Sequence, residues 1–161
     1  MLYVFAAFIL FYVIAFLSPK RLTGIEIYAT SLFGYAYGLT TDVVLDLHYD
    51  LYGYIAPGFQ WLGLLGIVLY FPVISFLFLN FLPDSFGGKI VYGAGWTVFS
   101  LTFEWFAVQT HFFYYNGWNL WYSALSYPLI FIVLICNLSI VRSIFRRSTT
   151  PTHGAATKWK S

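Results

Sequence analysis

Charged residues are scarce in this chain of 161 residues. Only 9% are charged, whereas 60% are hydrophobic and 24% are aromatic. Soluble domains carry roughly 25% charged residues, so this composition excludes a soluble domain and is typical of a protein that lies in lipid. A helix that spans a bilayer needs about 20 apolar residues. With its connecting loops, the chain has room for five such helices.

Cysteine and the short motifs of well-known chemistry are also nearly absent. The single cysteine, Cys136, lies in the last apolar run, which excludes a disulfide within the chain. The sequence holds no glycine-rich phosphate loop, no nucleophile elbow and no paired-cysteine motif, so by itself it assigns no enzymatic activity. Nothing in it indicates a nucleic-acid partner.

The apolar runs predict an all-α integral membrane bundle of five transmembrane helices in residues 1–141. Residues 142–161 form a basic cytoplasmic tail, which we expect to be disordered. Pro72 and Pro128 lie inside the third and fifth runs and predict a kink in each helix. The five expected spans are residues 1–17, 22–46, 61–80, 90–109 and 120–140.

All eight Lys and Arg residues fall on one side of the membrane if the chain crosses it five times. They lie in the loop after the first span, in the loop after the third span and in the tail. The positive-inside rule makes this side cytoplasmic and places the N-terminus outside, so we expect a multi-pass protein of the plasma membrane. Three arginines of the tail are expected to bind anionic lipid headgroups, at about 1 kcal/mol each. They are Arg142, Arg146 and Arg147.

The second span carries small and polar residues at every fourth position, which places them along one ridge of a helix. Within this ridge, Gly34 and Gly38 form a small-xxx-small notch that lets a neighbouring backbone approach closely. Near the inner end, Glu26 is expected to pair with Lys20 or Arg21. The ridge consists of Glu26, Thr30, Gly34, Gly38, Asp42 and Asp46.

Acidic and histidine side chains gather in the predicted outer half of the membrane. Glu104 lies roughly 21 Å from the cytoplasmic end of the fourth span, at a rise of 1.5 Å per residue, and shares a helix face with His111. If the second and fourth helices touch, Glu104 faces Asp42 or Asp46. No Lys or Arg lies in this half, so the acids have no fixed cationic partner. We call the candidate site the outer acidic cluster; it consists of Asp42, Asp46, His48, Glu104 and His111.

Acids inside a membrane without a cationic partner avoid an isolated charge in three ways. They reach interfacial water, they are protonated, or they hold a cation. One candidate for this cation is a divalent metal ion, bound as a cofactor and shared with a histidine. The sequence therefore predicts a small polytopic membrane protein whose outer acidic cluster binds a cation or relays protons. Two alternatives stay open. One is a structural or partner-binding subunit, as a homo-oligomer or with another membrane protein; the other is a metal-dependent membrane enzyme that acts on lipid or isoprenoid substrates.

The aromatic residues of the two outer loops have two interpretations. Tyrosine and tryptophan are enriched where lipid meets water, so a belt at the interface explains them most simply. Their rings can also surround an organic cation. They include Tyr49, Tyr52, Tyr54, Trp61, Tyr114, Tyr115, Trp118 and Trp121.

Three stretches of the chain carry a resemblance to a known group of proteins. They are TTDVVLDLHYDLYGY at residues 40–54, FEWF at residues 103–106 and YYNGWNLWYSALSYPLIF at residues 114–131. Over most of residues 22–135 the chain resembles an uncharacterised family of small multispanning proteins from Gram-positive, spore-forming bacteria. The resemblance implies the bacterial plasma membrane and supports the predicted architecture, but it implies no substrate.

Overall fold

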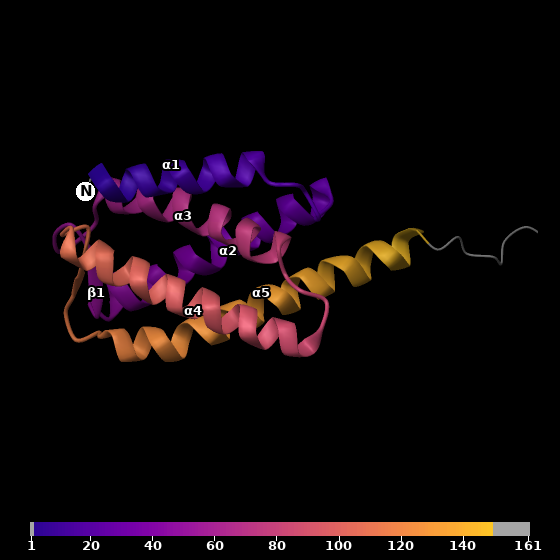
Figure 1. Ribbon diagram of the computed structural model, residues 1–161. Helices are drawn as coiled ribbons and strands as arrows, with labels where there is room; N and C mark the ends of the chain where they lie inside the picture. The colour runs from indigo at the N-terminus through magenta and orange to yellow at the C-terminus, as the bar shows by residue number, and fades with distance from the viewer. Residues whose placement is uncertain (1, 150–161) are drawn as a thin grey trace, which may run out of the picture.

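The computed structural model describes residues 2–149, most of which are helical (Figure 1). The predicted helical architecture with five long helices is confirmed, and two short strands lie in the connections between them. The elements are α1 (Leu2–Leu17), α2 (Gly24–Asp42), the π-helix η1 (Val43–His48), β1 (Tyr52–Tyr54), α3 (Trp61–Asn80), α4 (Phe86–Gln109), β2 (Phe113–Tyr115) and α5 (Leu120–Thr149).

Local capping residues set where two of the helices begin. The Thr23 hydroxyl accepts a hydrogen bond from the Glu26 backbone N–H at 3.4 Å, and the Glu26 carboxylate accepts one from the Thr23 backbone N–H at 2.7 Å. This reciprocal capping box satisfies amide groups that the first turn of α2 leaves unpaired. Ser85 caps α4 by accepting a hydrogen bond from the Gly88 backbone N–H at 3.1 Å. α4 therefore begins before Ile90, the start expected from the apolar run.

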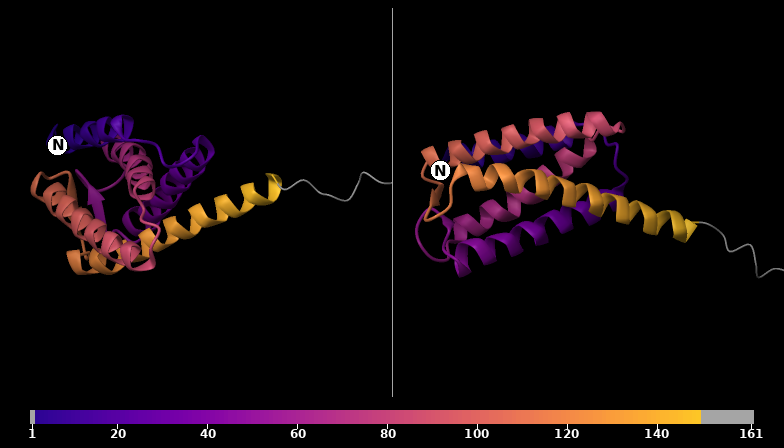
Figure 2. Two further views of the ribbon diagram at one scale, coloured as in Figure 1. Left: turned by 45° about the vertical axis from the view of Figure 1, so that its right-hand side comes forward. Right: turned by 90° about the horizontal axis from the view of Figure 1, so that it is seen from below.

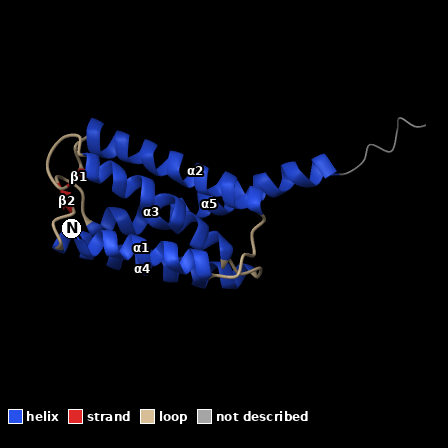
Figure 3. Cartoon of the chain, turned by 90° about the horizontal axis from the view of Figure 1, so that it is seen from above, coloured by secondary structure: helices blue, strands red, loops and turns tan. Residues whose placement is uncertain are grey.

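Consecutive helices connect at alternating ends of the bundle (Figures 1 and 3). The N-terminus lies at the same end as β1 and β2, which we call the strand end. The α1–α2 and α3–α4 loops lie at the opposite end, and the C-terminal part of α5 projects beyond it (Figure 2). Lys20 and Arg21 belong to the first of these loops, Lys89 to the first turn of α4 and Arg142 to the C-terminal part of α5. We call this second end the basic end.

α2 packs on α3 through the ridge of residues that recur at every fourth position. A Cβ atom added at Gly34 would lie 2.0 Å from Ser75 Oγ, and one added at Gly38 would lie 2.4 Å from the Phe71 ring. Only glycine allows the two backbones to approach this closely. The buried residues of α2 are Glu26, Thr30, Gly34, Gly38 and Asp42.

The ridge ends at Asp42, because the helix widens into the π-helix η1 at the next residue. A π-helix pairs residues five apart and has more residues per turn than an α-helix, so a spacing of four no longer keeps one face. Asp42 is 6% exposed, whereas Asp46 is only partly buried. The expected continuation of the ridge to Asp46 is therefore lost within one turn.

Aromatic rings from several helices meet in the centre of the bundle. Phe8 of α1 is buried against Tyr70 of α3 and Phe103 of α4. The Tyr70 and Phe103 rings stack with their centroids 5.2 Å apart. Phe78 of α3 packs on Phe131 of α5 at 4.4 Å between centroids. Each such pair stabilises the packing by about 0.5–1.5 kcal/mol beyond the burial of its area.

Large apolar side chains also cover the outside of the bundle. Leu2, Phe16, Phe86 and Trp121 are 80%, 83%, 81% and 82% exposed. A monomer surrounded by water rarely exposes an apolar surface of this kind. α3 and the segment Leu120–Arg147 of α5 are long and apolar enough to cross a membrane, and α1 is a shorter apolar helix. These features indicate association with a membrane.

The last helix is longer than its apolar run. α5 continues to Thr149, whereas the sequence predicted a span that ends at Ile140 and a disordered tail in residues 142–161. The first part of this tail is therefore helical, and residues 150–161 lie outside the described residues. Pro72 and Pro128 lie inside α3 and α5, and the kinks expected there stay predictions.

Candidate functional site

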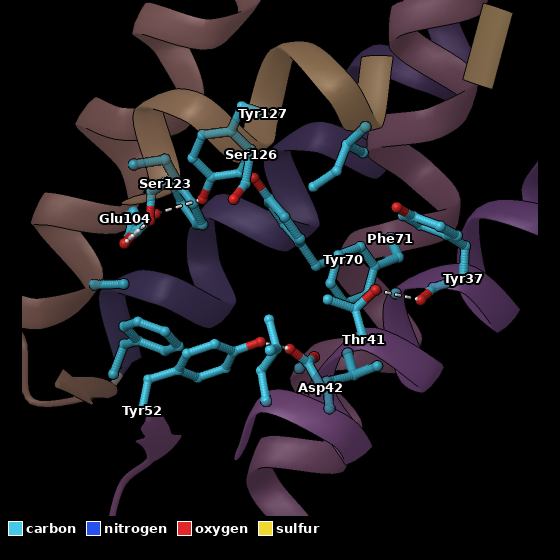
Figure 4. Close-up of a pocket in the computed structure, with 18 of the residues that line it drawn as sticks. Tyr37, Thr41, Asp42, Tyr52, Tyr70, Phe71, Glu104, Ser123, Ser126 and Tyr127 are labelled. Carbon is cyan, nitrogen blue, oxygen red and sulfur yellow. Dashed lines mark hydrogen bonds between the residues drawn. The ribbon is translucent and has the colours of Figure 1, made fainter. Parts of the chain in front are cut away.

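A cavity of about 290 Å³ lies between α2, α3, α4 and α5, and residues of β1 and β2 line it at the strand end (Figure 4). Asp42 of α2 and Glu104 of α4 both line this cavity. Figure 4 shows them on opposite sides of the space, with the Tyr52 hydroxyl pointing at Asp42. The two acids are 6% and 7% exposed, so both are buried.

Asp42 accepts hydrogen bonds from two phenol groups. The Tyr52 hydroxyl donates to Asp42 Oδ1 at 2.6 Å, and the Tyr54 hydroxyl donates to Asp42 Oδ2 at 3.0 Å. Burial raises the pKa of both tyrosines above the ordinary phenol value, and the neighbouring Asp42 raises it further. The phenols therefore keep their protons and act as donors to the carboxylate.

Glu104 accepts hydrogen bonds from three hydroxyl groups. Tyr115 and Ser123 donate to Oε1 at 2.6 and 2.7 Å, and Tyr127 donates to Oε2 at 2.6 Å. Ser123 is itself oriented by the Trp118 indole N–H, which donates to its hydroxyl oxygen at 2.8 Å. The carboxylate is thus held by β2 and by the first turns of α5, and its lone pairs point at hydroxyl protons rather than at a cationic side chain.

The described residues that line the cavity include no Lys, Arg or His. A buried carboxylate usually has a cationic partner or coordinates a metal, because an isolated buried charge is costly. Here, the side-chain partners of each acid are uncharged hydroxyl groups. The cavity is therefore an apolar, aromatic space with one buried acid on each of two sides.

The outer acidic cluster predicted from the sequence is only partly assembled. Asp42 and Glu104 share the cavity, but Asp46, His48 and His111 do not line it. His48 is exposed and contacts the Tyr49 ring, and His111 is exposed at a positive φ of 57°. Within residues 2–149, no group of three or more His, Cys, Asp or Glu side chains is placed to hold a metal ion. The divalent metal ion that the sequence suggests as a cofactor stays a prediction, and no such group of side chains supports it.

The sequence suggests a direct contact between the second and fourth helices, but in the structure their acids are brought together only through the cavity. α2 packs mainly on α3 and also on α5, whereas the two acids face one space from different walls. This space also bears on the second alternative from the sequence, a metal-dependent membrane enzyme, which requires a groove that leads to the acids. The cavity between the helices reaches both acids, and the enzymatic alternative stays a prediction.

Glu26 occupies a separate site near the basic end. Its Oε1 atom lies 2.6 Å from Arg142 Nε, and the two side chains are 10% and 45% exposed. The expected pairing of Glu26 with Lys20 or Arg21 is therefore replaced by a pairing with α5. Lys20 instead donates to backbone carbonyls at the end of α1, including that of Phe16 at 3.1 Å. The lipid-headgroup role expected for the three arginines of the tail stays a prediction.

Sequence reasoning missed the hydroxyl groups that hold the acids. The sequence favours an interfacial belt for Tyr52, Tyr54 and Tyr115 and indicates no role for Ser123 and Tyr127. A signal was present, because buried carboxylates need donors and the two outer loops are rich in tyrosine. The pairing itself depends on how the loops fold back over the bundle, which no spacing in the sequence specifies.

Comparison with family models, curated proteins and solved structures finds no match to this chain. The resemblance to a family of small multispanning proteins therefore stays a prediction.

Proposed function

We propose that the chain is a five-span protein of a bacterial plasma membrane, with its N-terminus outside and its C-terminus in the cytoplasm. The alternation of the connections between two ends supports this topology. The positive-inside rule supports the orientation, because Lys20, Arg21, Lys89 and Arg142 belong to segments of the basic end. The exposed apolar side chains on the outside of the bundle then face lipid.

We further propose that the cavity binds a cation, or holds a proton in transfer, between Asp42 and Glu104. The observation that carries this proposal is the position of two buried acids on one cavity that has no basic lining residue. On insertion scales, one charge at the centre of a bilayer costs on the order of 3 kcal/mol. A positive charge placed between the two acids offsets part of that cost, so the site favours a cationic occupant.

A structural role is the competing function, and one observation favours it. Five hydroxyl groups already satisfy the two carboxylates and connect β1, β2 and α5 to them. In that case the acids hold the strand end together and bind nothing. This role predicts that neutral variants lose stability without any change in their response to cations.

The experiment that separates these roles is thermal unfolding of the purified protein across a series of inorganic cations and pH values. The variants are Asp42→Asn and Glu104→Gln, and the matched control is Asp84→Asn, an exposed acid in the α3–α4 loop. We expect one cation, or protons, to stabilise the wild type and the control, and this response to be lost in both cavity variants. A response that is the same in all four proteins would contradict the proposal.

The topology is tested with single cysteines in a Cys136→Ser background. Phe59→Cys lies in the loop before α3 at the strand end, and Asp84→Cys lies in a loop at the basic end. A membrane-impermeant maleimide added to intact cells is expected to label the first variant only. Labelling of both variants, or of the second alone, would contradict the proposed orientation.

A further inference from the structure

The cavity is larger than a metal-ion site needs to be. A water molecule in the liquid takes up roughly 30 Å³, whereas the cavity holds about 290 Å³. A volume near 300 Å³ lies at the lower end of the range for small organic ligands. A single dehydrated ion would leave most of this space empty.

Aromatic rings form much of the cavity wall. Tyr52, Tyr70, Phe71 and Tyr127 are among the lining residues and surround the space between the two acids in Figure 4. Faces of aromatic rings attract cations through their quadrupole, and the attraction is stronger where water is excluded. A phenol that donates its proton to a carboxylate is also richer in electrons than a free phenol. Tyr52 and Tyr127 make such bonds.

The carboxylate oxygens are arranged better for an organic cation than for a metal ion. Each oxygen of Asp42 and Glu104 accepts at least one hydrogen bond from a hydroxyl. A metal ion bound directly to these oxygens would compete with those hydrogen bonds. A quaternary ammonium group has no N–H and forms no coordinate bond, so it needs only the negative field and the ring faces.

The cavity reaches the outside of the bundle beside α5. Leu129 lines it and is nevertheless 62% exposed. Leu129 belongs to the segment Leu120–Arg147, which is long and apolar enough to cross a membrane. In the proposed topology this opening faces lipid rather than water. An occupant with apolar substituents can therefore leave them at the opening while its charge lies deeper.

We infer that the occupant of this cavity is a lipophilic organic cation, whose charged centre lies between Asp42 and Glu104 among the aromatic rings and whose apolar part extends past Leu129 toward the lipid. This inference rests on the proposed cation site and names the chemical class of its occupant. It excludes a bare metal ion as the main ligand.

The test is calorimetric titration of the purified protein with benzyltrimethylammonium, and with neopentylbenzene as the uncharged probe of the same shape. We expect saturable binding of the cation and none of the neutral probe. Asp42→Asn and Glu104→Gln are expected to weaken binding of the cation about tenfold or more, since each removes one of two charges that face it in a desolvated site. Asp84→Asn is expected to leave binding unchanged.

A second variant keeps the test independent of the folding of the acid variants. Leu129→Trp narrows the opening but keeps both acids, and Leu125→Trp is the matched control because Leu125 is exposed on α5 and does not line the cavity. We expect only the first of these variants to weaken binding of benzyltrimethylammonium. Equal binding by both tryptophan variants would overturn the position of the occupant.

The outcomes separate this inference from the function on which it rests. An inorganic cation or protons could stabilise the protein through Asp42 and Glu104 while benzyltrimethylammonium does not bind. That result would overturn the inference and leave the proposed function standing. Binding of benzyltrimethylammonium that both acid variants retain would also overturn the inference. If neither cations nor pH change the stability of the protein in a way that depends on Asp42 and Glu104, both the inference and the proposed function would be overturned.

Discussion

Tyr52 and Tyr115 lie directly opposite each other in the antiparallel pair of β1 and β2, yet their hydroxyls donate to two different buried acids. Tyr52 donates to Asp42 and Tyr115 donates to Glu104, each at 2.6 Å. Opposite residues in such a pair have Cβ atoms about 4.5–5.5 Å apart. Two strands of three residues each thus connect the acids of α2 and α4 across the strand end of the bundle.

The first prediction concerns this connection. Tyr52→Phe and Tyr115→Phe each keep the ring and remove one donor to a buried carboxylate, so each is expected to lower the free energy of unfolding by about 1–3 kcal/mol. The measurement is thermal or denaturant unfolding in detergent, followed by circular dichroism. Tyr49→Phe is the control, because Tyr49 is 61% exposed. If all three variants were equally stable, the hydroxyls would not hold the acids in place.

The second prediction concerns the contact between α2 and α3. A Cβ atom at Gly38 would lie 2.4 Å from the Phe71 ring, so Gly38→Ala forces the ring or the helix to move. We expect a loss of about 1–3 kcal/mol in the free energy of unfolding, as is usual for overpacking. Unfolding in detergent measures it.

Gly93→Ala on α4 is the matched control for this substitution. A Cβ atom at Gly93 meets nothing within 4 Å, and alanine favours a helix over glycine by up to about 1 kcal/mol. The control is therefore expected to be neutral or slightly stabilising. A Gly38→Ala variant as stable as the control would mean that the two helices do not pack through the notch.

The third prediction concerns the ion pair between α2 and α5. We expect a double-mutant cycle of Glu26→Gln and Arg142→Gln to give a coupling energy of about 0.2–1 kcal/mol, which is the range that solvent-exposed ion pairs give. Arg142 is 45% exposed, so added salt should weaken the coupling. The control cycle combines Glu26→Gln with Lys20→Gln and should show no coupling. Coupling in the control alone would instead support the pairing that the sequence first suggested.

Helix positions and the buried face of α2 could be predicted because they depend on local regularities. α3 begins and ends at Trp61 and Asn80, the bounds of the apolar run. The repeat from Glu26 to Asp42 matches the buried residues of α2, since positions four apart lie along one ridge of an α-helix. The sequence does not show that this helix changes to a π-helix after Asp42, and so it places Asp46 on the same ridge as Asp42.

The sequence by itself determined that the chain is helical and apolar, that basic residues belong to alternate connections, and that Asp42 and Glu104 lie where an isolated charge is costly. These properties follow from composition, helix period and charge placement, which are local along the chain. Only the tertiary structure decided the partners: Arg142 for Glu26, 116 positions away, and tyrosine hydroxyls for the acids. The reason is physical, because a side chain in a packed bundle pairs with the group that folding brings within hydrogen-bond distance, whatever its separation along the sequence.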